Sequence, residues 1–355
     1  MTEPAFAPAA RRRTAVMAVL AAAVAVSFVL AVALGSTTIP LDQAVAALLR
    51  LENADPGAQT IIWTVRLPRA ITALLAGAAL SVAGVQMQTL FRNPLAEPYI
   101  LGVSSGASLG VALVVTGWGG LASAFTGGVA GLGRAGIVVA ASAGAAAVLG
   151  LVLALSRRVR SVVTLLIIGV MVGSTTASLI TLLLAYSDAQ RAQQYLGWSL
   201  GSYSGTTWGD LALFTPVCTA ALAAALMGVK PLNAMLLGEN YARTMGVRVR
   251  RVRTATLLTA SVLAGSVTAY CGPVAFLGLA VPHMAKLLLG TADHRVLMPA
   301  SVLLGGAVSL VCCIATQAPG SGAVLPLNAV TTVLGAPVVI AVLLRSRAAQ
   351  TGWAG

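Results

Sequence analysis

The fold is decided by residues 65–110, VRLPRAITALLAGAALSVAGVQMQTLFRNPLAEPYILGVSSGASLG. An apolar run at 69–90 ends in a short polar turn, and a second apolar run follows at 98–116. Pro94 and Pro98 prevent one continuous helix through the turn, and Pro98 can start the next helix. The stretch therefore predicts two apolar helices joined by a proline-bounded turn.

The composition extends this pattern to the whole chain. Of the 355 residues, 58% are hydrophobic and only 9% are charged, and the mean hydropathy is +0.93. A soluble domain is roughly 25% charged. The composition indicates an all-α polytopic membrane protein. The sequence contains no nucleic-acid-binding motif, so we expect no nucleic-acid partner.

The apolar runs predict ten membrane spans. A bilayer core about 30 Å thick needs roughly 20 apolar residues per helix. The first run resembles a signal peptide, but it is longer than the usual apolar core of one, so we expect an uncleaved helix. The predicted spans lie near 14–34, 69–90, 98–116, 135–155, 162–185, 208–228, 254–272, 274–289, 297–316 and 327–344.

The basic residues predict the orientation, because short loops rich in Lys and Arg stay in the cytoplasm. With the N-terminus inside, only five of the 22 bases fall outside, namely Arg50, Arg66, Arg69, Arg134 and Arg191. We therefore expect a multi-pass protein of the cytoplasmic membrane, with both termini cytoplasmic and its bases near lipid headgroups. The predicted parts are a tail at 1–13, one transmembrane domain at 14–345 with an inner loop at 229–253, and a tail at 346–355.

Two patterns suggest enzyme chemistry, but each has a structural explanation. GVSSG at 102–106 and GASLG at 106–110 match the nucleophile motif G-x-S-x-G, yet they fall in a membrane helix. Gly102, Gly106 and Gly110 are better explained as a small-residue face for helix packing. The two histidines form no metal-ligand pair. We predict no catalytic residue, no cofactor and no metal site, and an intramembrane hydrolase using Ser104 is the weakest alternative.

The acidic residues restrict the kind of transport. All nine fall in loops, tails or span ends, whereas cation-coupled carriers place ionisable groups at membrane depth. The chain also lacks the phosphate-binding motif G-x-x-x-x-G-K-[ST]. Energy for uphill transport would therefore come from a separate ATPase subunit. A passive channel remains the alternative from another class.

The inner loop offers a contact for such a partner. Its sequence, KPLNAMLLGENYARTMGVRVRRVR (230–253), contains helix-forming stretches broken by Gly238 and Gly246. Apolar residues among polar neighbours predict short amphipathic helices that fit a partner's groove. The alternative is a basic loop that only fixes the topology.

Four ordered motifs carry a family resemblance. They are residues 65–110, LLGENYARTMGV (236–247), GPVAFLGLAVPHMAKLLLGTADHRVLMP (272–299) and LPLNAVTTVLGAPVVI (325–340). Together they resemble the FecCD-type permeases, the membrane-spanning subunits of ABC importers for iron-siderophores, haem and cobalamin. The resemblance implies the ABC importer type II permease fold, with about ten transmembrane helices per protomer.

The resemblance also implies partners and a cargo. The expected partners are a second permease subunit, identical or homologous, two cytoplasmic ATP-binding subunits and an extracytoplasmic substrate-binding protein. An iron-siderophore is the leading cargo, and haem or cobalamin is the alternative.

Site residues follow from the same resemblance. It places binding-protein docking at Arg66 and Arg69, although both could instead anchor their helix at the headgroups. It places a cytoplasmic gate at Asn93 and Leu95. ATPase coupling falls on Leu237, Gly238, Glu239, Ala242, Met245 and Gly246. The chain departs from the family pattern at Gln317, Val324 and Asn328, which alters the expected outer rim.

Overall fold

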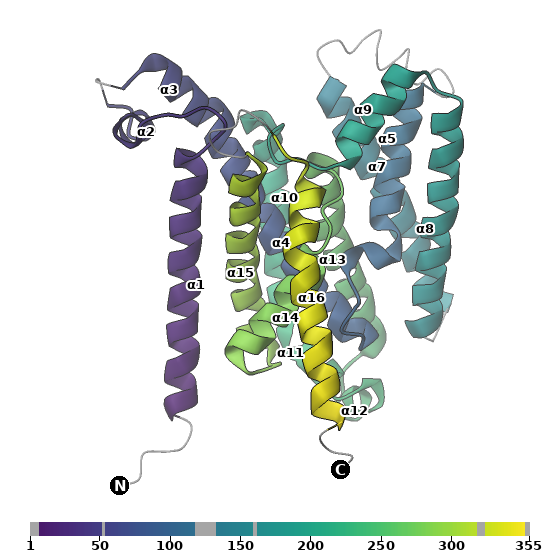
Figure 1. The fold of residues 1–355 in the computed structure, drawn as a ribbon. Helices are drawn as coiled ribbons and strands as arrows, with labels where there is room; N and C mark the ends of the chain where they lie inside the picture. Colours follow the sequence, from purple (N-terminus) through teal and green to yellow (C-terminus); the bar gives the residue numbers. More distant parts are fainter. Residues whose placement is uncertain (1–6, 52–53, 118–132, 159–161, 318–323, 352–355) are drawn as a thin grey trace. The chain divides into compact units, whose positions relative to one another are not determined.

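The computed structural model describes residues 7–51, 54–117, 133–158, 162–317 and 324–351. Every regular element in these ranges is helical (Figure 1). The elements in chain order are α1 (Ala7–Ala33), α2 (Leu41–Leu48), α3 (Pro56–Ile61), the π-helix η1 (Ile62–Arg66), α4 (Leu67–Phe91), the 3₁₀-helix η2 (Pro98–Leu101), α5 (Val103–Thr116), α7 (Gly133–Arg158), α8 (Val162–Ala185), α9 (Ala189–Ser199), α10 (Trp208–Met227), α11 (Val229–Leu236), α12 (Glu239–Thr244), α13 (Val249–Cys271), α14 (Leu277–Leu289), α15 (His294–Thr316) and α16 (Leu327–Thr351).

Ten of these helices match the ten predicted spans. Among the described residues, seven helices are long and apolar enough to cross a membrane, by length and composition. Three shorter apolar helices, at Val103–Thr116, Leu277–Leu289 and Leu327–Ala341, coincide with three further predicted spans. The prediction of an all-α polytopic fold is confirmed. The helix η2 lies within the predicted span at 98–116, and the remaining helices lie outside the predicted spans.

The span predicted at 98–116 is broken rather than continuous. The 14 residues of α5 rise about 21 Å at 1.5 Å each, which is short of a bilayer core of about 30 Å. The four residues of η2 precede α5 and add about 8 Å. Gly102 joins the two with φ +76°, a left-handed conformation that glycine adopts without strain. The two helices together therefore have the length of one span.

Two of the short helices outside the predicted spans, α3 and α9, have start signals in the sequence. Asp55 accepts a hydrogen bond from the Ala58 backbone at 2.7 Å, with Pro56 as the first residue of α3. Asp188 accepts from the Arg191 backbone at 3.0 Å and so starts α9. Aspartate at the N-cap and proline at the first helical position are known start signals. Our prediction treated these segments only as polar loops.

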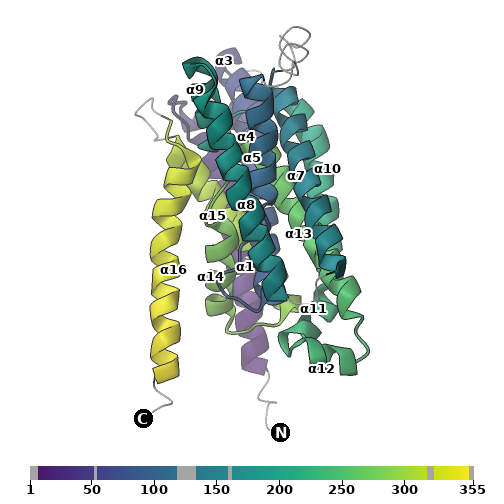
Figure 2. The same cartoon turned by 90° about the vertical axis from the view of Figure 1, so that its right-hand side faces the viewer.

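The chain forms two compact units. Unit 1 comprises residues 1–85 and 275–355, and unit 2 comprises residues 86–274. In unit 1, α1 begins and α16 ends at the same end, as the chain termini in Figures 1 and 2 show. In unit 2, α11 and α12 lie at the end opposite α9 (Figure 2). The single permease domain at 14–345, with its tails, stays a prediction.

Unit 1 is held together by close backbone contacts between helices. A methyl group at Gly77 of α4 would overlap the carbonyl of Gly305 in α15, and one at Gly84 would overlap Gly278 in α14. Next to the first crossing, the Ser81 hydroxyl donates to the Ser301 carbonyl at 2.7 Å. In a bilayer, helices associate through such close van der Waals contact and interhelical hydrogen bonds. The small residues of α4 are therefore what allow these helices to touch.

This packing predicts a position-specific effect of adding one methyl group. Gly305→Ala should lower the unfolding free energy by about 1–3 kcal/mol, since the methyl group meets Ser81 and the Gly77 carbonyl in a packed interior. Gly150→Ala in α7 is the matched control, because nothing lies within 4 Å of the added carbon. Thermal unfolding of the purified variants in detergent measures the difference. Equal midpoints for the two variants would contradict the packing argument.

Candidate functional site

The predicted inner loop folds into two short helices at one end of unit 2. The helices are α11 (Val229–Leu236) and α12 (Glu239–Thr244). Gly238 precedes α12 with φ +106°, and Gly246 follows it with φ +80°. Residues with a side chain rarely adopt these backbone angles, so both turns need glycine. The predicted pair of glycine-broken helices is confirmed.

Apolar side chains project from this loop. Leu237 is 63% exposed and Met245 is 60% exposed, and the Tyr241 ring is also exposed. Ala242 is completely buried on the opposite side of α12. An exposed apolar cluster beside a buried face is typical of a helix that binds a partner. We call Leu237, Tyr241 and Met245 the loop patch.

Glu239 fastens α12 to the start of α13. Its carboxylate lies 2.6 Å from the Arg253 guanidinium and 3.3 Å from that of Arg243. Arg253 is buried in the first turn and a half of α13, whereas Arg243 is exposed. The structure shows the ion pair, and no side-chain cap bond at the start of α12.

The polar turn at residues 92–97 lies beside this loop. The Asn93 side chain accepts a hydrogen bond from the Leu95 backbone at 2.9 Å, which closes the turn. Leu95 is exposed. The Arg92 guanidinium lies next to Gly238, where an added side-chain carbon would be 3.5 Å from it. The structure thus brings the predicted gate turn and the predicted coupling loop together within unit 2.

Glu97 ends this turn with a half-buried carboxylate. It precedes Pro98, the first residue of η2, so the predicted helix start at Pro98 is confirmed. Burial raises the pKa of the Glu97 carboxyl above its usual range. Ionising Glu97 is therefore less favourable in this turn than in water.

The raised pKa predicts a pH-dependent stability. A group whose pKa is higher in the folded state stabilises the fold at low pH, and this contribution is lost as pH rises through the folded pKa. Glu97→Gln mimics the neutral form, so it should match wild type at acidic pH and be more stable at neutral pH. Thermal midpoints across that range test this. A midpoint difference that does not change with pH would show that burial does not perturb Glu97.

Arg66 lies inside unit 1, at the end of α1. It is 2% exposed, and it donates to the carbonyls of Val32 at 3.2 Å, Ala33 at 2.5 Å and Thr37 at 2.5 Å. The last carbonyls of a helix have no partner within the helix, and a cation there is favourable. Arg66 therefore closes the C-terminal end of α1.

Arg69 is also buried, beside Cys313 of α15. Neither predicted docking arginine is thus presented at the surface of the described chain. Among the predicted outer bases whose side chains the structure describes, two are exposed. Arg50 lies 4.1 Å from the centre of the Trp63 ring, and Arg191 pairs with Asp188. A docking role for Arg66 and Arg69 stays a prediction.

The position of Arg66 predicts a loss of stability on substitution. Arg66→Met keeps an unbranched apolar stem but leaves buried carbonyls without a donor, so it should cost about 1–3 kcal/mol. Arg50→Met, at an exposed cation–π contact, should cost less than about 1 kcal/mol. Thermal unfolding compares the two. An unchanged midpoint for Arg66→Met would refute the anchoring role.

The glycines of α5 have two different roles in unit 2. Gly102 supplies the left-handed turn before α5, as described above. An added methyl group at Gly106 would meet the Gly144 carbonyl of α7, and one at Gly110 would meet the Ala140 carbonyl. Gly106 and Gly110 therefore lie where α5 crosses α7 at backbone distance. Ser104 is buried in the same helix.

The departures from the family pattern have structural positions in unit 1. Gln317 is the buried C-cap residue of α15, and Val324 is exposed before α16. The Asn328 side chain accepts a hydrogen bond from the Ala275 backbone at 3.0 Å, which ties α16 to the segment before α14. The glycine usual in the family has no such side chain. Sequence reasoning missed this contact, because it joins residues 53 positions apart.

Both histidines lie in helices. His283 Nδ1 lies 2.9 Å from the Leu279 carbonyl in α14, and His294 is the buried first residue of α15. The described residues contain no group of three His, Cys, Asp or Glu side chains that could hold a metal ion.

Comparisons with known proteins agree with this arrangement. A model of the FecCD transport family matches residues 23–345. The ABC transporter permease protein YvrB of Bacillus subtilis (strain 168) is 36% identical over 330 residues, which cover 90% of this chain and 91% of YvrB. The vitamin B12 import system permease protein BtuC of Klebsiella pneumoniae is 37% identical over 294 residues, covering 81% and 84%.

A solved structure, described as an inward-facing conformation of a metal-chelate type ABC transporter, is also similar. It has a TM-score of 0.81 and 26% sequence identity, and the match covers 94% of this chain and 99% of that one. These features define a multi-span transport permease. The chain belongs to the FecCD transport family.

Proposed function

We propose that this chain is the permease subunit of an ATP-binding cassette importer that moves a metal chelate across the cytoplasmic membrane. The observation that carries the proposal is the loop patch on a helix fixed to a membrane helix, in a chain of this family. The chain itself performs no chemistry. Its helices alternate between outward and inward access while partners supply energy and cargo.

The partners follow from this role. A second permease subunit, identical or homologous, completes the pathway, two cytoplasmic ATP-binding subunits bind the inner loops, and an extracytoplasmic binding protein delivers the chelate. Both termini and α11–α12 would then face the cytoplasm, as the distribution of basic residues predicts.

Coupling would proceed through the inner loop. An ATPase groove that receives Leu237 and Met245 moves α12, and the Glu239–Arg253 ion pair passes this movement to α13. The adjacent turn with Asn93 and Leu95 would act as the cytoplasmic gate, because Arg92 lies against Gly238 at the start of α12. The glycine turns allow the loop to keep its shape close to the partner.

We propose an iron-siderophore as the cargo. The similarity to a metal-chelate type transporter supports the chelate class. Cobalamin is the second candidate, because relatives 35–37% identical are named vitamin B12 permeases; haem is the third. Against cobalamin stand the departures at Gln317, Val324 and Asn328, which alter the predicted outer rim.

Uptake by the reconstituted importer tests the function and the cargo. The permease is co-purified with its ATPase and binding protein, placed in liposomes, and supplied with radiolabelled ferric siderophore, haem or cobalamin. We expect uptake of the ferric siderophore. This uptake should require ATP on the side of the liposome membrane where the ATPase subunits lie. Uptake without ATP would indicate a passive channel, and cobalamin as the accumulated cargo would overturn the siderophore assignment.

Loop variants provide the control for coupling. Met245→Ser should reduce ATPase co-purification and uptake, because it removes an exposed apolar contact. Met227→Ser is matched, since this methionine is also exposed, at the end of α10. Equal loss in both variants would mean that the loop patch is not the ATPase contact.

A further inference from the structure

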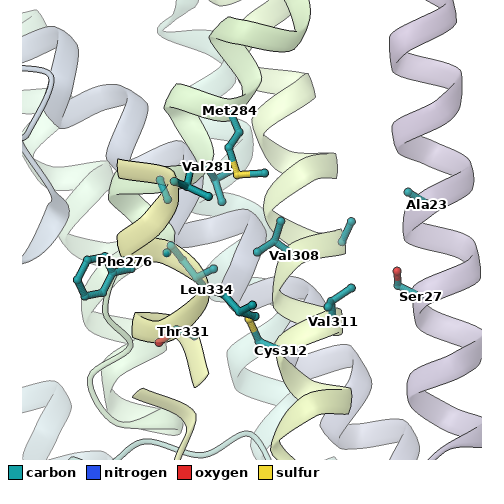
Figure 3. A pocket seen from close by; sticks show the side chains of 15 residues that line it. Ala23, Ser27, Phe276, Val281, Met284, Val308, Val311, Cys312, Thr331 and Leu334 are labelled. Carbon is teal, nitrogen blue, oxygen red and sulfur yellow. The ribbon is translucent and has the colours of Figure 1, made fainter. Parts of the chain in front are cut away.

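A groove in unit 1 opens between α1 and the helices α14, α15 and α16. Its volume is about 330 Å³. Figure 3 shows Ala23 and Ser27 of α1 facing Val308 and Val311 of α15, with the side chains of α14 and α16 beyond. Most lining side chains are aliphatic, and the polar ones among them carry only single hydroxyl or thiol groups. An occupant therefore needs apolar surface and few hydrogen bonds.

The groove begins near the basic start of α1 and runs past the membrane centre. Arg12 Nη2 lies 3.4 Å from the Leu288 carbonyl, near the end of α14. Met284 lines the groove one turn before Leu288, about 6 Å from that level at 1.5 Å per residue. Ala23 and Ser27 line it further along α1, about 16 Å and about 22 Å beyond Arg12. Half of a bilayer core is about 15 Å, so the groove runs from just below the arginines to beyond the membrane centre.

Positive charge lies at the shallow end of this groove. Arg11 and Arg12 are exposed, and Arg13 is partly exposed. Basic residues at this depth attract anionic lipid headgroups. A flexible acyl chain can fill a narrow apolar space of any outline. The combination of an apolar groove with a basic entrance matches a phospholipid with an anionic headgroup.

We propose that the groove binds one acyl chain of an anionic phospholipid whose headgroup contacts Arg11, Arg12 and Arg13. The lipid would fill the space between α1 and α14–α16 and so fix the position of α1. This site is separate from the gate turn, the coupling loop and the transported cargo. It depends on insertion in a membrane and does not depend on the proposed import function.

Native mass spectrometry of the full-length protein tests the site. The purified, delipidated protein is titrated with phosphatidylglycerol or with phosphatidylcholine carrying the same chains. We expect one phosphatidylglycerol per chain, bound about tenfold more tightly than phosphatidylcholine. Ala23→Phe should abolish this binding by filling the groove, and Ala22→Phe, on the exposed side of α1, should keep it.

The headgroup contact has its own variant. Replacing Arg11, Arg12 and Arg13 with Gln should remove the preference for phosphatidylglycerol, whereas Arg295→Gln, an exposed base at the start of α15, should keep it. Val311→Phe narrows the groove from its opposite wall. It serves as an independent groove variant if Ala23→Phe does not fold.

Four results would overturn the proposal. They are equal binding by Ala23→Phe and wild type, equal loss in Ala22→Phe and Ala23→Phe, equal affinity for the two lipids, and a loss of dimer mass in Ala23→Phe without any change in bound lipid. The last result would assign the groove to a second copy of the chain.

Discussion

Close backbone contact at glycine is the constraint on which both units depend. In a bilayer, lipid chains are as apolar as leucine, so burial alone gives helices little reason to associate. Unit 1 meets this constraint where Gly77 and Gly84 of α4 touch Gly305 and Gly278. Unit 2 meets it where Gly106 of α5 touches Gly144 of α7. The apolar runs specify helices, and the glycines specify which of them can touch.

Because the helices pack closely along their lengths, the candidate functional features lie at the helix ends. Within unit 2 the turn at 92–97 and the helices α11 and α12 are neighbours, and one ion pair joins α12 to α13. Within unit 1 the C-terminal end of α1 is closed by a buried arginine. In unit 1 a charge at a helix end thus stabilises the fold. In unit 2, in our proposal, a charge at a helix end transmits movement.

The spans were predictable because each depends on local composition. A run of about 20 apolar residues has few alternatives in a membrane, and Pro98 and Gly238 mark their turns by backbone chemistry alone. The helices α3 and α9 were also detectable in principle, from Asp55 and Asp188. They were missed because polar segments were treated as loops.

The remaining site features depend on contacts between distant residues. Arg66 lies in a motif that suggested an exposed docking residue, yet its partners lie 29 to 34 positions earlier, at the end of α1. Asn328 and Ala275 are 53 positions apart. No periodicity in the sequence indicates such pairs, so only three-dimensional structure distinguishes an anchoring arginine from a docking one.

The central claim is that α12 and α13 move together through Glu239 and Arg253. The most direct measurement is the amount of cargo taken up per ATP hydrolysed, in liposomes, for Glu239→Arg, Arg253→Glu and the variant with both changes. The account predicts that each single change lowers this ratio while ATP hydrolysis continues, and that the reversed pair restores it. An unchanged ratio in the single variants would contradict the claim.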